Sequence, residues 1–384
     1  MVIFMSKKKV MIGLSGGVDS AVAAYLLKQQ GYEVIGGFMR NWDSTLNNDV
    51  LGNPKLSEED ICPQEKDYND AKEVAKLLDI PLYRIDFIKE YWDNVFSYFL
   101  EEYKKGRTPN PDILCNKYIK FDSFAKYART FDVDYIATGH YAKIEHIDGK
   151  AIMSKASDLN KDQTYFLCQV SQEQLKDVLF PLGDVDKPTV RRIAHELGLN
   201  VADKKDSTGI CFIGERNFKE FLSNYLPSKD GEIRDIKSNK VVGKHVGVLY
   251  YTIGQRKGLG IGGSKEFGND SWFVVAKDVP NNILYVAQGD DNEYLVSDCC
   301  YVTDVNIIDD RLTDGLKCQA KFRYRQADNE VEVKFDGDNL IVLYPQGIKS
   351  VTPGQEAVFY LDGVCLGGGT IDKVYRNNKQ IIYK

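Results

Sequence analysis

The stretch KVMIGLSGGVDSAVAAYLLKQQG, residues 9–31, decides the fold. Its first part, KVMIGLS (9–15), is an apolar run with the length of a buried strand. Residues 18–30 place apolar side chains at helical spacing, with Gly31 as the stop signal, and so predict a helix. A strand followed by a helix is the unit from which parallel α/β sheets are built.

The turn between them, GLSGGVDS (13–20), has the composition of a phosphate-binding loop. Its glycines allow successive backbone N–H groups to point into one concavity, and the helix start adds a positive dipole end. Ser15 and Ser20 supply hydroxyl donors, and Asp19 could hold a magnesium ion or the loop itself. A short glycine turn can be only a turn, but the full S-G-G-x-D-S string between strand and helix is more specific. The loop lacks the lysine that kinase-type loops place against the terminal phosphates.

The first third of the chain repeats this alternation. We expect strands at 33–39, 82–88 and 133–139, and helices at 67–79, 91–104 and 118–130. This order predicts a doubly wound parallel sheet, in which ligands bind beyond the carboxyl ends of the strands. Ser15, Met39 and the pair Gly139-His140 fall at three of those ends.

The rest of the chain differs in composition and in the spacing of its apolar residues. Beyond about residue 217 glycine becomes dense and strands follow at short intervals, and the last ninety or so residues are typical of a β-barrel. We therefore expect a domain built on the parallel sheet over 1–217, a small β-rich domain over 218–292 and a C-terminal β-barrel domain over 293–384. No apolar run approaches the roughly 20 residues of a membrane span, and a cytoplasmic location is expected.

Strict alternation in LKCQAKFRYRQ (316–326) predicts a strand with one basic face. The side chains expected on that face are Lys317, Gln319, Lys321, Arg323 and Arg325. Because the formal net charge of the whole chain is −6, a footprint for nucleic acid has to be local. The basic ladder is either such a footprint or an ordinary solvated strand face, and the pattern alone leaves both interpretations open.

The cysteines lie at 62, 115, 168, 211, 299, 300, 318 and 365, with no C-x-x-C pair. This spacing argues against a zinc ribbon or a disulfide framework, and most of them should be buried small hydrophobic residues. Cys115 and Cys211 differ, because each lies in a polar loop with Gly or Pro nearby. We expect Cys115 just ahead of a helix that begins near Lys117; that helix start, Lys117 and Lys120 should lower its pKa, and Asp112 could handle a proton beside it.

Several motifs carry a resemblance to a known family. SGGVDS (15–20) is the signature of the PP-loop ATP pyrophosphatases, which cleave ATP between the α and β phosphates. The motifs that follow are NPDILCN (110–116), GHYAKI (139–144), KDQTYFL (161–167), DSTGICFIGER (206–216), YTIGQRKGLGIGG (251–263) and TPGQ (352–355). Together they closely resemble the tRNA-specific 2-thiouridylases over nearly the whole length.

This resemblance implies a sulfurtransferase that modifies the wobble uridine of certain tRNAs. ATP, with Mg²⁺, would adenylate the uridine O2, and sulfur would arrive as a persulfide on Cys211, so that the products are 2-thiouridine, AMP and pyrophosphate. Cys115 is by similarity the nucleophile and could close a disulfide with Cys211 as sulfur is released. The implied partners are tRNA and a sulfur donor, either a cysteine desulfurase or a sulfur-relay protein.

The resemblance also implies roles for individual residues. It places the ATP contacts at Gly13, Leu14, Ser15, Gly16, Gly17, Val18, Asp19, Ser20, Met39 and Gly139. It places the contacts with the target base at Asn110, Pro111 and Asp112, and further tRNA contacts at His140, Lys161, Asp162, Gln163, Arg323, Tyr324 and Gln355. It makes Cys115, Cys211 and Asp112 catalytic and gives Cys62 no role.

Three alternatives remain at this stage. Amidating PP-loop synthetases need an ammonia source, and this chain has no glutaminase-like extension. A non-catalytic RNA- or nucleotide-binding protein would not need both thiols and the intact loop. An iron–sulfur cluster on Cys115, Cys211 and Asp112 could carry the sulfur, although such clusters usually have four cysteine ligands.

Overall fold

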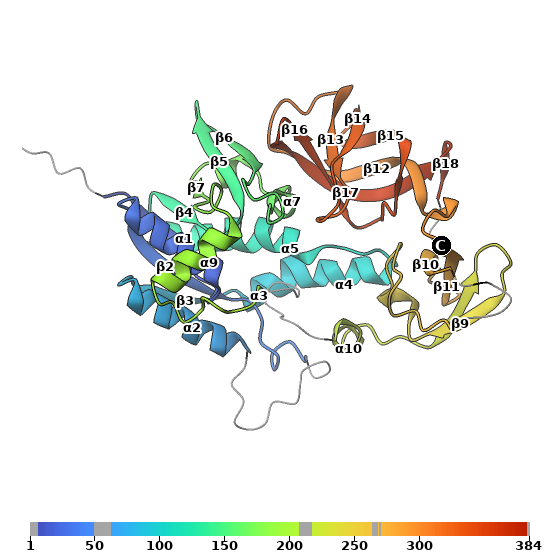
Figure 1. Ribbon diagram of the computed structural model, residues 1–384, viewed down its shortest axis with the longest axis horizontal. Coiled ribbons are helices and arrows are strands. Elements are labelled where there is room, and N and C mark those ends of the chain that lie inside the picture. The colour runs from blue at the N-terminus through green and yellow to red at the C-terminus, as the bar shows by residue number, and fades with distance from the viewer. Residues whose placement is uncertain (1–6, 50–62, 207–216, 263–267, 269, 382–384) are drawn as a thin grey trace, which may run out of the picture.

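The computed structural model describes residues 7–49, 63–206, 217–262, 268 and 270–381. Figure 1 shows three parts: an N-terminal α/β part in blue to green, a small part in yellow, and a C-terminal barrel in orange to red. This architecture confirms the predicted fold class, while the exact domain boundaries stay a prediction. In the described ranges, no helix combines the length and apolar character needed to cross a membrane.

The N-terminal part is built on five parallel strands in the order β3-β2-β1-β4-β7. The strands are β1 (Lys9–Gly13), β2 (Glu33–Arg40), β3 (Leu82–Asp86), β4 (Tyr135–Ala137) and β7 (Val178–Leu179). Alternation along β1 sends Val10 and Ile12 into one hydrophobic core and Met11 into another, so both faces of the sheet are covered. The predicted doubly wound sheet is confirmed.

Each core is completed by its own helices. One contains apolar residues of α1 (Val18–Gln29), α2 (Pro63–Leu77) and α9 (Lys187–Glu196). The other contains those of α3 (Ile88–Tyr91), η1 (Trp92–Phe96), α4 (Ser97–Lys104), α5 (Pro111–Leu114), η2 (Cys115–Ser123) and α6 (Phe124–Arg129). The short helices α7 (Thr164–Leu167) and α8 (Gln172–Leu175) also contribute to this second core.

The helix that carries Cys115 begins earlier than expected. Asn110 caps it, because the Asn110 side chain accepts a hydrogen bond from the Asp112 N–H at 3.1 Å, and Pro111 occupies the first helical position. The helical run then continues through α5 and η2 into α6. The expectation that Cys115 precedes a helix starting near Lys117 is therefore wrong: Cys115 lies inside the run, at the start of a π-helical segment.

The remaining chain is mostly strand, as expected. The small part contains α10 (Phe218–Ser223), β8 (Gly231–Asp235), β9 (Val241–His245), η3 (Val248–Tyr250), β10 (Trp272–Asp278) and β11 (Ile283–Gln288), with the strand order β10-β11-β8-β9. The barrel follows η4 (Glu293–Leu295) and contains β12 (Val296–Ile307), β13 (Leu316–Lys321), β14 (Asn329–Asp336), β15 (Asn339–Lys349), β16 (Glu356–Leu361), β17 (Val364–Arg376) and β18 (Lys379–Gln380). Pairing of β12 with β17 closes it. A hairpin of the N-terminal part, β5 (Ala142–Ile147) and β6 (Lys150–Lys155), joins the same sheet where Ser154 pairs with Val364.

Candidate functional site

The glycine loop after β1 has a backbone that only glycine permits at one position. Gly16 has φ +72°, and a Cβ added there would collide with the carbonyl oxygen of Asp67. Ser20 fixes the loop from inside: its hydroxyl accepts from the Ser15 N–H at 3.2 Å and donates to the Gly17 carbonyl at 3.0 Å. Helix α1 begins at Val18 with no side-chain cap from Gly17. The loop therefore points a helix N-terminus toward the carboxyl edge of the sheet, where an anion can bind.

The structure brings the other two predicted nucleotide contacts to this loop. A Cβ on Gly139, which follows β4, would lie 2.9 Å from the Ser20 nitrogen, so the two backbones touch. Met39 lies in β2 and is almost fully buried, and its methyl group would be 2.9 Å from a Cβ on Gly13. Residues from the ends of three neighbouring strands thus contact the glycine loop or the strand that leads into it, at the edge where parallel sheets bind ligands.

The positive charge that the loop lacks in its own sequence comes from distant segments. Lys187, at the start of α9, places its ammonium 2.7 and 2.8 Å from the two carboxylate oxygens of Asp19. Lys204 donates to the Gly16 carbonyl at 2.8 Å and to Asp67 at 2.7 Å. Two lysines therefore bind directly to the glycine loop.

Asp206 links this ionic group to further cations. Its carboxylate lies 2.7 Å from the ammonium groups of both Lys161 and Lys187 and 2.9 Å from the Arg191 guanidinium. Partial burial acts to raise the pKa of Asp206, but the hydrogen bonds from Lys161 and Lys187 outweigh it and lower the pKa to about 2. Asp206 therefore stays charged and holds the lysines beside the loop.

Lys187 and Lys204 were not predicted from the sequence as neighbours of the loop. One signal was available for Lys187, because a cation in the first turn of a helix opposes the helix dipole and needs a partner elsewhere. No comparable local signal marks Lys204.

Cys115 is fully buried at the start of η2. The lysines expected to act on it reach other partners: Lys117 donates to Gln169 at 3.1 Å, and the Lys120 ammonium lies 3.4 Å from His140 Nε2. The disulfide implied by the resemblance is not supported, because the described residues contain no disulfide. Cys211 and Cys62 lie outside the described residues.

His140 is buried behind the loop. Its Nδ1 is 2.7 Å from the Thr138 hydroxyl, and its ring lies near Phe121 and Phe180. Burial, together with the nearby Lys120 ammonium, lowers the pKa of His140 well below its ordinary value. The imidazole is therefore neutral at pH 7 and connects the Cys115 helix to the end of β4.

The segment 161–163 is held largely by its own side chains. Asp162 is buried and accepts hydrogen bonds from the Ala156 N–H and the Thr164 hydroxyl. Burial raises the pKa of Asp162 above its ordinary value. Gln163 accepts from the Tyr141 N–H at 2.9 Å. These contacts shape the segment and leave Lys161 as its more exposed charged member.

The predicted tRNA residues of the barrel lie where the three parts meet. Gln355 donates from its amide to the Thr108 carbonyl of the N-terminal part. Arg323 donates to the Ile253 carbonyl of the small part at 2.7 Å and to the Thr352 hydroxyl at 2.9 Å. The ring of Tyr324 lies 4.3 Å from that of Phe166, measured between centroids. This three-part junction (Thr108, Ile253, Arg323, Thr352 and Gln355) adjoins the Asn110–Asp112 segment through the chain itself.

The basic ladder differs from its expectation. Strand β13 ends at Lys321, and residues 322–326 form a turn closed by a hydrogen bond from the Gln326 N–H to the Arg323 carbonyl. The expected strand through 326 is therefore wrong, and Arg323 and Tyr324 escape strict alternation. Across the sheet, Lys317 is in register with Glu332, so the charge of the remaining ladder faces a carboxylate.

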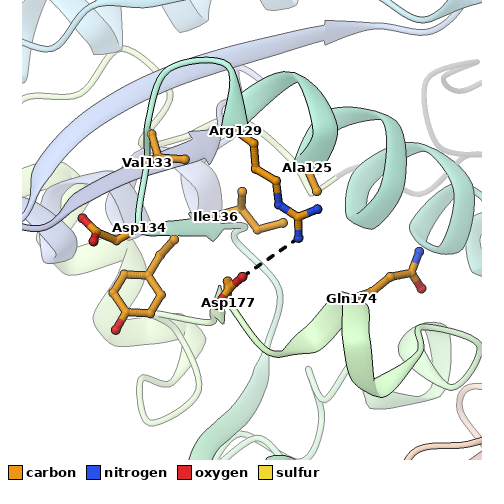
Figure 2. Close-up of a pocket in the computed structure, with 8 residues that line it drawn as sticks. Ala125, Arg129, Val133, Asp134, Ile136, Gln174 and Asp177 are labelled. Carbon is orange, nitrogen blue, oxygen red and sulfur yellow. Dashed lines mark ion pairs between the residues drawn. The ribbon is translucent and has the colours of Figure 1, made fainter. Parts of the chain in front are cut away.

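A separate hollow lies away from this site (Figure 2). Its lining includes Val133, Asp134 and Ile136 at the start of β4, with Arg129 and Asp177 4.0 Å apart across it. Asp134 also accepts from the backbone N–H of Lys9, where β1 begins. The hollow is thus at the amino edge of the sheet, opposite to the loop, and is not part of the candidate site.

Comparisons with known proteins agree with this arrangement. Family models match residues 8–215 (tRNA methyl transferase HUP domain), 219–288 (tRNA methyl transferase PRC-barrel domain) and 297–371 (aminomethyltransferase beta-barrel domain). The chain is 60% identical to the tRNA-specific 2-thiouridylase MnmA of Mycoplasma capricolum, with 96% of this chain and 100% of the relative covered. It is 58% identical to that of Mesoplasma florum, with the same coverage, and 53% identical to that of Staphylococcus aureus, with 99% and 100% covered. The chain belongs to the tRNA-specific 2-thiouridylase family.

Proposed function

We propose that this tRNA 2-thiouridylase acts in two steps: ATP first activates the O2 of the wobble uridine, and a cysteine-bound sulfur then replaces that oxygen. One observation carries the proposal. The helix bearing Cys115 reaches, through Lys120 and His140, the strand end at Gly139 that touches the glycine loop. A thiol-bearing helix and a phosphate-binding loop are thereby parts of one site.

In the first step the uridine O2 forms a bond to the α-phosphorus. The bond from the α-phosphorus to the oxygen that bridges the α and β phosphates breaks, and pyrophosphate leaves with that oxygen. The loop N–H groups and the α1 N-terminus would bind the leaving pyrophosphate, with Lys187 and Lys204 as the nearest cations. Asp19 has the oxygen ligands that Mg²⁺ prefers and would hold the metal bound to ATP, which would supply further neutralisation of phosphate charge.

In the second step sulfur from a persulfide on Cys211 bonds to C2 of the base, and AMP leaves with the original oxygen. Cys115 is the second thiol, and Asp112, two residues into the same helix, handles the proton. The Cys115 thiolate then attacks the inner sulfur, that of Cys211, so that the persulfide S–S bond breaks and 2-thiouridine is released. The two cysteines are thereby oxidised to a transient disulfide, which an external thiol reduces. The donor that loads Cys211 belongs to the class of cysteine desulfurases or sulfur-relay proteins.

The tRNA would lie across the three-part junction, with its wobble base flipped toward Asn110, Pro111 and Asp112. Gln355, Arg323 and Tyr324 border this region from the barrel, and Lys161, Asp162, Gln163 and His140 border it from the N-terminal part. Because Asp162 and His140 are buried, they support the contact surface, whereas Lys161 is placed to meet phosphate. The location that we propose for this activity is the cytoplasm.

The test is nucleoside mass spectrometry of tRNA after incubation with ATP and a persulfide source. We expect 2-thiouridine, AMP and pyrophosphate from the native protein, and no 2-thiouridine from Cys115→Ser or Cys211→Ser, each with tRNA binding retained. Formation of ADP and phosphate, or thiolation by the double serine variant, would contradict the proposal. Cys168→Ser is the matched control, because Cys168 is, like Cys115, a fully buried cysteine.

A further inference from the structure

Asn41 lies just beyond β2 and is unusual among the described residues. Its side chain is 0% exposed, yet neither its amide nitrogen nor its amide oxygen has a hydrogen-bond partner. Buried polar side chains are nearly always paired, since a lost hydrogen bond to water is otherwise not replaced. Both ends of this carboxamide are therefore available to something the chain itself does not supply.

The polar groups on either side of Asn41 are satisfied. The Arg40 guanidinium pairs with Asp43 and Asp86, and the Arg40 carbonyl accepts from the Phe87 N–H at 2.8 Å. The Trp42 indole donates to Asp49 at 3.0 Å. The segment is thus firmly held, and the unpaired groups are confined to the one side chain between these residues.

The position of Asn41 relates it to the nucleotide site. Gly37 and Met39 lie on the face of β2 that packs against Phe124 and Gly13, and Asn41 comes two residues after Met39, directly past the end of the strand. It therefore follows Met39 at the carboxyl edge of the sheet, next to the strand that leads into the glycine loop.

We propose that the Asn41 carboxamide recognises the adenine base of ATP by pairing with its 6-amino group and an adjacent ring nitrogen. An amide offers one acceptor and one donor side by side, which matches that edge of adenine. The proposal rests on the ATP-dependent function above. Adenine is favoured over the target uracil because Asn41 directly follows β2, two residues after Met39, whereas the expected uracil contacts, Asn110 to Asp112, begin a different element.

The test compares the binding of two nucleotides by calorimetry in the absence of tRNA: ATP and purine riboside triphosphate, which lacks the 6-amino group. For the native protein we expect ATP to bind about tenfold more tightly than the analogue, the effect of one hydrogen bond to a buried group. Asn41→Ala and Asn41→Leu should weaken ATP binding by about tenfold or more and bind both nucleotides equally. Asn292→Ala is the matched control, since Asn292 also has an unpaired buried amide oxygen but lies between β11 and η4, outside the parallel sheet.

The Tm measured without nucleotide is a second test, because the substitution that lowers ATP affinity should not lower the Tm. Asn41→Leu replaces an unpaired amide by an apolar group of similar size and should keep or raise the Tm, whereas a residue with a structural partner would lose stability. A fall in Tm, or unchanged discrimination between the two nucleotides, would overturn the inference. Loss of tRNA binding with unchanged ATP affinity would also overturn it and would assign Asn41 to the uracil. If the native protein discriminates as expected but does not thiolate tRNA, the proposed function fails and this inference stands.

Discussion

The glycine loop and the basic strand of the barrel make opposite use of charge. The loop 13–20 contains no cation in sequence, yet Lys187 and Lys204 bind to it in space. The strand 316–321 contains two lysines in sequence, yet Lys317 is in register with Glu332 and Lys321 lies 4.0 Å from Asp328. The local electrostatic field therefore depends on which segments the fold brings together, because charges act through space over several ångströms.

The largest expected effect comes from the loop backbone. Gly16→Ala would place a methyl group against the Asp67 carbonyl at a backbone conformation that alanine disfavours, so ATP affinity should fall by about 100-fold or more. Gly315→Ala, just before the basic strand, is the control: its φ is +74° but nothing lies within 4 Å of the added Cβ. It should cost about 1 kcal/mol of stability and leave ATP binding unchanged. Calorimetry and thermal unfolding measure both, and equal ATP affinities of the two variants would break the comparison.

The next effect concerns the lysines that bind to the glycine loop from distant segments of the chain. Lys187→Met leaves Asp19 and Asp206 without their shared ammonium and removes positive charge beside the proposed pyrophosphate site. The rate at which ATP is cleaved to AMP and pyrophosphate should therefore fall by about 100-fold. Lys155→Met is a close control, because Lys155 is about as buried and pairs with Asp328 at 2.6 Å. The rate of ATP cleavage by Lys155→Met should stay near that of the native protein. Similar slowing in both variants would mean that the loss of any buried ion pair lowers the rate, wherever the pair lies.

A smaller effect on tRNA affinity distinguishes Arg323, in the turn after the basic strand, from Lys317 within that strand. Arg323→Glu should weaken tRNA binding by about tenfold and reduce the slope of its salt dependence by about one, because it reverses a charge at the three-part junction. Lys317→Glu should change tRNA affinity by less than about twofold, since its charge is already opposed by a carboxylate. Filter binding across a salt series measures both slopes. A large loss with Lys317→Glu would return the whole ladder to the tRNA interface.

The smallest effect is on stability in acid. The pKa of Asp206 is lowered to about 2 from its ordinary 3.8, so its charged form stabilises the folded protein above that ordinary value. This contribution is lost as the pH falls from about 4 to about 2. Asp206→Asn should therefore flatten the fall of Tm in that interval, and Lys161→Met, which removes one of its hydrogen bonds, should do so less. An unchanged pH profile would show that the cations hold the loop without Asp206.

The sequence predicted much of this molecule because its signals are local. Strand and helix periodicity, the glycine loop and the change in texture near residue 217 each depend on neighbours in the chain, and all recur in the structure. The errors were also local. The Asn110-Pro111 cap was overlooked, which displaced the start of the Cys115 helix, and alternation was extended past Lys321 into a turn.

From the sequence alone came the type of most elements and the glycine loop between β1 and α1, since backbone conformation and side-chain periodicity are set within a few residues. Only the tertiary structure decided which charges surround that loop, that the basic ladder faces an acidic strand, and that Asn41 is buried without a partner. These features involve residues tens or hundreds of positions apart, and no local pattern encodes which of them will meet.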